Sequence, residues 1–349
     1  MTDPMETEEA RALRDAVRAL LTRRSGPEAV RAALESPLGY DDKLWSTLCE
    51  QIGVAALAIP EQYGGAGAGL AEVCVVLAEL GRTLTPAPML GSAVLSAQAL
   101  LLTGNDAVCG ELLPGIAAGT TLAALAWSGA DGRWTPALSA SDAGLDGRAC
   151  YVLDGDIADV LLAVARTDDG TGLFEVPLDG VRRERVTSLD PGRRLAVVEC
   201  AAAPVRRLDT GGFAEPLRQL RDTATIAVAA EQVGAAARAL ELTVEYTKQR
   251  RQFGRPIGSF QALKHRMADV HVHVEAARSA LYAALVDGDA EAVATAKVVC
   301  GEAFEHAAAE MIQLHGGIAI TWEHDAHLYF KRAHGTALLF GDPGSWLSR

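Results

Sequence analysis

Apolar residues in the first third of the chain recur at intervals of three and four positions. Examples are Leu13, Val17, Leu20, Leu21, Val75, Leu77 and Leu80. This spacing gathers apolar side chains on one face of a helix, so we expect amphipathic helices packed on one another from Glu6 to about Leu113. Proline and several glycines interrupt the pattern between Ile59 and Gly67, which predicts a turn-rich connector there.

The pattern changes between about Leu122 and Arg207. Short apolar runs such as 151–153, 160–165 and 195–200 alternate with turns that contain Asp-Gly or glycine. Runs of this length and spacing are typical of strands joined by tight turns. We therefore expect a small antiparallel sheet or barrel in the middle of the chain.

The last third returns to a helical pattern. Residues 217–248 contain no proline and one glycine, and their alanine, leucine and valine content predicts one long, largely buried helix. Breaks at 255–258, 287–289 and 316–317 predict two or three further helices.

These patterns divide an α+β chain into three regions. We expect an N-terminal helical domain at residues 1–118, a small antiparallel β domain at 119–211, and a C-terminal four-helix bundle at 212–349. With 349 residues, of which 49% are hydrophobic, the chain is long enough to bury substantial cores.

Composition narrows the classes of partner. The chain has 32 Lys and Arg against 45 Asp and Glu, and its net charge of -13 disfavours nucleic acid and anionic membranes, which attract clustered positive charge. Six dispersed cysteines form no C-x-x-C pair, and His315, His324, His327 and His334 lack metal-site spacing, so we expect neither a metal nor a disulfide framework. The acidic N-terminus has no apolar segment and no apolar run has membrane length, which predicts a soluble cytoplasmic protein.

Two motifs in the last third are specific. Residues 246–262 read YTKQRRQFGRPIGSFQA, and residues 313–318 read QLHGGI. Together they resemble, in the same order, the C-terminal half of acyl-CoA dehydrogenases, in which an arginine, a Phe-Gly pair and a Phe-Gln pair precede a Gln-x-x-Gly-Gly turn. Residues 60–67 and 145–159 resemble further segments of that family, so the similarity covers most of the chain. It implies the acyl-CoA dehydrogenase fold, FAD as cofactor and an acyl-CoA thioester as substrate.

The resemblance implies cofactor-binding roles for six residues. They are Arg250, Phe253, Gln261, Gln313, Gly316 and Gly317. An arginine offers the pyrophosphate of FAD a forked, charged donor, and glutamine amides suit its adenosine part. The glycines lack Cβ atoms where the backbone turns and a ligand approaches. In this family, these motifs reach the FAD that is held by the neighbouring subunit. By residue type alone, each of the six is more common as an ordinary surface, turn or core residue.

The half of the site that holds the flavin ring departs from the family. Residues 127–136 read WSGADGRWTP and lack the family's stretch from Thr-Glu-Pro to Gly-Ser-Asp. The family's reaction needs a glutamate that removes the α-proton of the thioester while the β-hydride passes to the flavin. At the two positions where the family carries this glutamate, the chain has Phe340 and Ala224. The nearest carboxylates are Asp342, Asp222 and Glu231.

We therefore hypothesise that the chain is a non-catalytic β-type subunit. It is similar to such subunits of actinobacterial acyl-CoA dehydrogenases that assemble as α2β2 heterotetramers in steroid side-chain degradation, and residues 321–327 support this resemblance. The resemblance implies one FAD at each interface between unlike chains, with the base on a homologous catalytic partner. Two alternatives stay open. One is a self-sufficient homomeric dehydrogenase that uses Asp342, Asp222 or Glu231 as a displaced base, in that order of preference; the other is a non-enzymatic oligomerisation scaffold.

Overall fold

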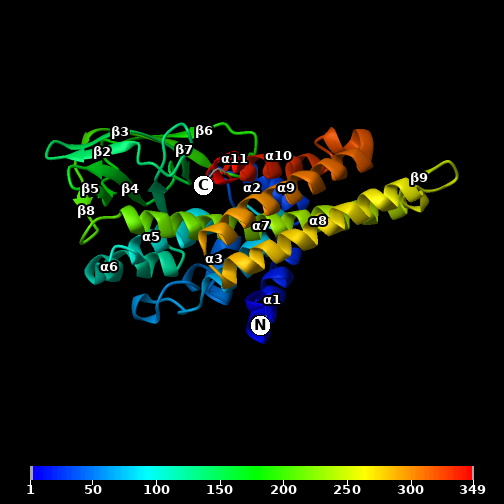
Figure 1. Cartoon of the computed structure of the whole chain (residues 1–349), viewed down its shortest axis with the longest axis horizontal. Coiled ribbons are helices and arrows are strands. Elements are labelled where there is room, and N and C mark those ends of the chain that lie inside the picture. The colour runs from blue at the N-terminus through cyan, green and yellow to red at the C-terminus, as the bar shows by residue number, and fades with distance from the viewer. Residues whose placement is uncertain (1–2, 348–349) are drawn as a thin grey trace.

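A β sheet stands at one end of the molecule, and a bundle of long helices extends away from it (Figure 1). The computed structural model describes residues 3–347. The N-terminal helices pack against both the sheet and the bundle.

The N-terminal region is helical, as predicted. It contains α1 (Glu8–Arg24), α2 (Pro27–Glu35), α3 (Asp42–Ile52), α4 (Leu70–Thr83), the π-helical segment Met89–Ser96, α5 (Ala97–Leu101) and α6 (Asp106–Ala117). Side-chain caps fix the starts of α1, α3 and α6. The hydroxyl of Thr7 accepts from the N–H of Ala10 at 3.1 Å before α1, and the carboxylate of Asp41 accepts from the N–H of Leu44 at 3.0 Å before α3.

Residues 123–207 form an eight-stranded sheet. Its strands are β1 (Ala123–Ala126), β2 (Leu138–Ser141), β3 (Gly144–Leu153), β4 (Val160–Thr167), β5 (Gly170–Val176), β6 (Arg182–Val186), β7 (Leu195–Ala203) and β8 (Arg206–Arg207). The order is β6-β7-β3-β2-β4-β5-β8, with β1 paired to β4. In β7, side chains alternate between buried and half-buried over residues 195–200, because successive side chains point to opposite faces of a sheet.

The C-terminal region is a helical bundle around one long central helix. Its elements are α7 (Ala214–Gln249), the hairpin strands β9 (Arg251–Gln252) and β10 (Arg255–Pro256), α8 (Gln261–Val286), α9 (Ala290–His315), α10 (Ala326–Leu338) and α11 (Pro343–Leu347). With 36 residues, α7 is about 54 Å long at 1.5 Å per residue. It packs against α4, α8 and α9, so the middle of α7 is buried on nearly all sides.

Two glycines let α4 and α7 cross in backbone contact. A Cβ added at Gly81 on α4 would lie 2.2 Å from the carbonyl oxygen of Glu231 on α7. A Cβ added at Gly234 on α7 would lie 2.0 Å from the carbonyl oxygen of Ala78 on α4. Neither position has room for a side chain, which explains the single glycine in the long helix.

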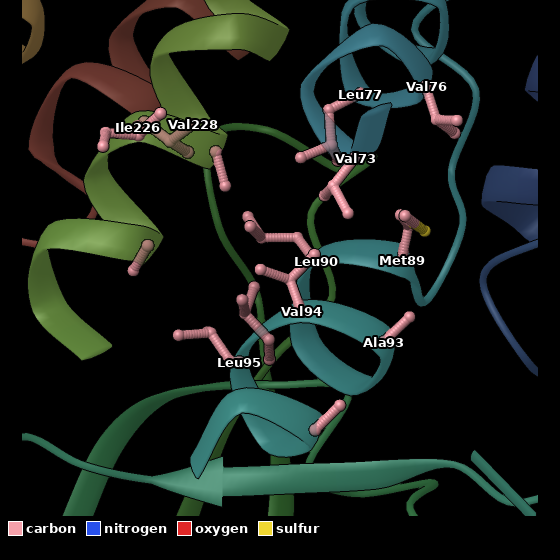
Figure 2. Close-up of a cluster of buried hydrophobic side chains, with 14 of the residues drawn as sticks. Val73, Val76, Leu77, Met89, Leu90, Ala93, Val94, Leu95, Ile226 and Val228 are labelled. Carbon is pink, nitrogen blue, oxygen red and sulfur yellow. The ribbon is translucent and has the colours of Figure 1, made fainter. Parts of the chain in front are cut away.

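The largest hydrophobic cluster joins the N-terminal helices to the bundle. Figure 2 shows part of it, where side chains of α4, the π-helical segment and α7 point toward one another. The labelled residues are Val73, Val76, Leu77, Met89, Leu90, Ala93, Val94, Leu95, Ile226 and Val228. A second cluster fills the far half of the bundle, and a third lies within the sheet.

The predicted order of helical, β and helical regions is confirmed. The long helix predicted at 217–248 extends from Ala214 to Gln249, and the predicted breaks fall between helices. Two details differ. The sheet adds parallel pairings because β1 and β2 both lie alongside β4, and the short helix α11 was not predicted because its Pro-Gly start hides it from periodicity. No helix within residues 3–347 is both long and apolar enough to span a membrane.

Candidate functional site

The first motif forms the far tip of the bundle, where β9 is labelled in Figure 1. Helix α7 ends where the N–H of Arg250 donates to the carbonyl of Tyr246 at 2.8 Å, and the β9–β10 hairpin follows. At the hairpin turn, Phe253 and Gly254 have φ of 51° and 75°. The side chain of Phe253 projects into solvent and is 88% exposed.

The second motif lies beside the first. Helix α9 ends at His315, and the Gly316–Gly317 turn follows it. The hydroxyl of Tyr246 donates to the carbonyl of His315 at 3.2 Å, and the two rings stack with centroids 4.2 Å apart. The structure thus brings together two segments that α8 and α9 separate in sequence. All six residues predicted to bind the cofactor are exposed: Arg250, Phe253, Gln261, Gln313, Gly316 and Gly317.

Packing within this chain does not explain the second glycine of the turn. Gly316 has φ of 66°, a conformation that disfavours side chains. Gly317 lacks a positive φ, and a Cβ built on either glycine meets no heavy atom of residues 3–347 within 4 Å. The turn therefore presents bare backbone to solvent, which suits the close approach of a ligand.

Two arginines near Arg250 brace the hairpin. Arg251 donates to the carbonyl of Gly254 at 3.0 Å, and the guanidinium of Arg255 lies 4.0 Å from the ring centroid of Phe260. Arg250 is exposed at the base of this braced hairpin. A guanidinium in this position offers forked N–H donors to an anionic ligand.

The expected base positions lie near the other end of α7, where the bundle meets the sheet. The ring of Phe340 packs on Trp127 and Trp134, with centroids 5.5 Å from each, and the two tryptophans are 4.3 Å apart. Trp127 and Phe340 are each 1% exposed, and Ala224 is fully buried. Both positions are therefore apolar and enclosed, and aromatic side chains of this chain fill the space beside Phe340.

Hydrogen bonds hold Phe340 in this arrangement. Its φ of 67° is unusual for a bulky residue and costs on the order of 1 kcal/mol or more. The indole N–H of Trp134 donates to the carbonyl of Phe340 at 3.3 Å. The fully buried ammonium of Lys297 donates to the carbonyls of Ala337 at 2.9 Å and Leu339 at 2.6 Å, at the end of α10. Burial lowers the pKa of Lys297 to about 7.

All three candidate carboxylates have structural partners, and those of Asp342 and Asp222 are close in sequence. Asp342 is exposed and accepts from the N–H of Gly344 at 3.1 Å, at the start of α11. Asp222 pairs with the adjacent Arg221 at 2.7 Å. Within residues 3–347, no group of three or more His, Cys, Asp or Glu is placed to hold a metal ion.

The third candidate, Glu231, belongs to a buried ionic network. Arg193 donates to its two carboxylate oxygens at 2.6 and 2.7 Å, and Arg332 donates both to Glu231 and to Asp190. Burial alone would raise the pKa of Glu231, but attraction by Arg193 and Arg332 outweighs burial and lowers it. A carboxylate with a lowered pKa and two bound guanidiniums is a weak proton acceptor.

A long distance separates the two parts of the candidate site. Ala224 lies on α7 and Arg250 caps the C-terminal end of the same helix, about 39 Å away along its axis at 1.5 Å per residue. The tip and the buried aromatic cluster are therefore distinct places on the molecule, as Figure 1 also shows.

Comparisons with known proteins agree with the motifs. Residues 7–120 match the N-terminal domain of acyl-CoA dehydrogenases, and residues 212–343 match the C-terminal domain. Acyl-CoA dehydrogenase IpdE2 of Mycolicibacterium smegmatis is 45% identical over 343 residues, which cover 98% of each chain. The chain belongs to the acyl-CoA dehydrogenase family. The cofactor of this family is FAD.

Two solved structures are similar to this acyl-CoA dehydrogenase chain over nearly its whole length. A chain of the ChsE4-ChsE5 complex from Mycobacterium tuberculosis is 31% identical, with a TM-score of 0.92, and the match covers 100% of this chain and 97% of that one. A chain of a variant of the Tcur3481-Tcur3483 steroid ACAD is 32% identical, with a TM-score of 0.89 and coverage of 98% and 96%. The predicted acyl-CoA dehydrogenase fold is thus confirmed.

The sequence did not reveal the residues that support the tip of the bundle and the aromatic cluster around Phe340. Lys297 interrupts the apolar face of α9, and a lone charge on such a face is a signal for a buried, partnered group. Trp127 and Trp134 are visible in the sequence only as a departure from the family pattern. Nothing local pairs Tyr246 with His315, because the contact depends on where α7 and α9 end.

Proposed function

We propose that this chain completes, in trans, the FAD site of a heteromeric acyl-CoA dehydrogenase whose catalytic glutamate is supplied by a homologous partner chain. The observation that carries the proposal is the distance between the cofactor motifs at the tip and the enclosed positions where the family carries its glutamate. Arg250 and the Gly316–Gly317 turn lie at the exposed tip, about 39 Å along α7 from Ala224. The tip therefore serves a flavin whose ring lies on another chain. Because aromatic side chains fill the space beside Phe340 in every copy of this chain, that other chain is an unlike one.

The residues at the tip fit the adenosine and pyrophosphate part of FAD. Arg250 would donate paired N–H groups to the pyrophosphate, and the amides of Gln261 and Gln313 would bind the adenosine part. Gly316 and Gly317 let the backbone approach the cofactor, since no side chain stands in the way. FAD bound there would supply the acceptor for the β-hydride of the acyl-CoA thioester, and the partner's carboxylate would take the α-proton.

The residues at the aromatic cluster do not fit a flavin ring. Trp127, Trp134 and Phe340 are in mutual ring contact, and the first and last are 1% exposed. A carboxylate in place of Phe340 would be enclosed by apolar rings, where an unpaired charge is strongly disfavoured. This arrangement supports a subunit without a working ring site of its own.

The names of similar proteins support the assembly and the substrate class. One solved relative is a complex of two chains, ChsE4 and ChsE5, and another is a steroid ACAD. By similarity, we propose an acyl-CoA thioester from steroid or lipid breakdown as the substrate of the heteromeric enzyme.

The test compares the isolated chain with the complex formed on co-expression with homologous acyl-CoA dehydrogenases from the same genome. We expect flavin absorbance and turnover only in a complex, with one FAD for each pair of unlike chains. Full FAD occupancy and turnover by the isolated chain would overturn the proposal in favour of a homomeric enzyme. In that case Asp342→Ala, Asp222→Ala and Glu231→Gln variants would identify the displaced base.

One variant distinguishes the proposed function from the alternative of a non-enzymatic oligomerisation scaffold. Arg250→Gln removes the charged fork from the tip, and we expect it to lower the FAD content of the purified complex while the subunits stay associated. A complex that retains all of its FAD after this change would favour a chain used for assembly alone.

A further inference from the structure

We infer that Tyr246 and His315 are positioning residues that lock the Arg250 segment to the Gly316–Gly317 turn, so that both flavin-binding segments form one preformed surface. This inference rests on the function proposed above and adds two residues to which that function assigns no role.

Tyr246 is bonded to both segments at once. Its backbone carbonyl accepts from the N–H of Arg250 at 2.8 Å, which ends α7 and starts the hairpin. Its hydroxyl donates to the carbonyl of His315 at 3.2 Å, the last residue before the Gly316–Gly317 turn. The position of the turn is thereby tied to the residue that sets the direction of Arg250.

His315 gives Tyr246 a fixed surface. The imidazole stacks on the ring of Tyr246 with an interplanar angle of 25°, and the ring of His324 packs against the imidazole with centroids 4.6 Å apart. Burial lowers the pKa of His315 to about 4, so the ring is neutral near pH 7. The neutral ring donates from Nδ1 to the carbonyl of Met311 at 2.7 Å, which fixes its orientation at the end of α9.

The contact between Tyr246 and His315 matters because the flavin-binding segments that it connects are exposed. Arg250, Phe253 and the glycine turn lie on the surface, whereas His315 is 5% exposed. Two independent exposed segments would both lose conformational freedom on binding FAD, and this loss would reduce affinity. The stack of half-buried Tyr246 on buried His315 holds them together before binding and so reduces this entropic cost.

Tyr246→Phe tests the inference in the co-expressed complex after removal of FAD. The variant keeps the stacked ring and removes one hydrogen bond, so we expect the Kd for FAD to rise about fivefold. Fluorescence titration of the apo complex with FAD measures this change. The kcat at saturating FAD and the KM for acyl-CoA should stay at their original values, because the residue acts only on the arrangement of the cofactor-binding segments.

Tyr151→Phe is the matched control. The hydroxyl of Tyr151 also donates to a backbone carbonyl, that of Ala130 at 3.1 Å, but in the β domain. We expect no change in FAD affinity for this variant. His315→Ala keeps the carbonyl but removes the stacked ring, and it should weaken FAD binding at least as much as Tyr246→Phe.

The outcomes separate this inference from the proposed function. If Arg250→Gln weakens FAD binding while Tyr246→Phe and His315→Ala behave as Tyr151→Phe, the positioning role is overturned and the proposed function stands. If Tyr246→Phe lowers the Tm of the apo complex and excess FAD fails to restore turnover, the residue is merely structural and the inference is wrong. If no complex forms, or Arg250→Gln leaves the Kd for FAD unchanged, the proposed function and this inference both fail.

Discussion

Gln232 is a buried polar side chain whose amide group lacks hydrogen-bond partners in the described structure. It is fully buried on α7, and within residues 3–347 neither its amide nitrogen nor its amide oxygen has a hydrogen-bond partner. The amide nitrogen faces α9, because a Cβ added at Gly301 would lie 3.7 Å from it. A buried amide in this condition costs about 1–3 kcal/mol. The residue therefore weakens the contact between α7 and α9.

Replacement of Gln232 by methionine should stabilise the protein. Gln232→Met keeps a similar side-chain length and removes the unsatisfied amide, so we expect the free energy of unfolding to rise by about 1–2 kcal/mol. Urea denaturation of the two proteins measures this difference in the free energy of unfolding. Gln219→Met, at an exposed position of the same helix, should change stability by less than about 0.5 kcal/mol. A less stable Gln232→Met variant would show that the native amide is satisfied in solution.

At the scale of elements, the buried ionic network joins the sheet region to the bundle. Asp190 and Arg193 belong to the loop before β7, Glu231 to α7 and Arg332 to α10. Because the pKa of Glu231 is lowered from 4.5, its stabilising contribution is complete above a pH of about 4.5 and is lost as the pH falls below this value. The network thus connects three elements that are distant in sequence.

Removal of Arg332 should be strongly destabilising. Arg332→Met leaves Glu231 and Asp190 buried without their shared cation, and we expect the free energy of unfolding to fall by about 3–5 kcal/mol. Arg182→Met is the control, because Arg182 pairs with Glu184 on the surface, with side chains 70% and 64% exposed, and should cost less than about 1 kcal/mol. Equal losses in the two variants would contradict the buried role.

Long elements were predictable and short ones were not. The stretch that becomes α7 has helix-forming residues over ten turns and a single glycine, so its type is evident from sequence. The five residues of α11 begin with Pro343 and Gly344, and they owe their helical form to the contact of α11 with α9. The parallel pairing of β2 with β4 likewise depends on strands that are distant in sequence.

At the scale of the whole molecule, exposed cofactor motifs lie at one end and an enclosed aromatic cluster at the other. In the proposed function, the tip contributes to a flavin site of another chain, whereas Trp127, Trp134 and Phe340 fill the space beside the expected base position. This polarity is what led us to propose a partner chain of a different kind.

Restoring a glutamate should not restore activity to the isolated chain. Phe340→Glu places a carboxylate against Trp127, so we expect a loss of several kcal/mol of stability and no turnover in a ferricenium-coupled acyl-CoA assay. Phe340→Leu keeps the position apolar and should lose less stability. Turnover by the isolated Phe340→Glu chain would mean that the aromatic cluster opens to admit flavin and substrate.

The sequence by itself determined the helical and β periodicities, the motifs around Arg250 and Gly316, and the apolar residues at Phe340 and Ala224. These features are local, because each depends on residue type and on spacing along a few turns. Only the tertiary structure decided that Tyr246 meets His315, that Lys297 supports the turn before Phe340, and that Ala224 and Arg250 lie about 39 Å apart along one straight helix axis. Such contacts join residues far apart in the chain, and they are set by where packed helices end and which faces they bury.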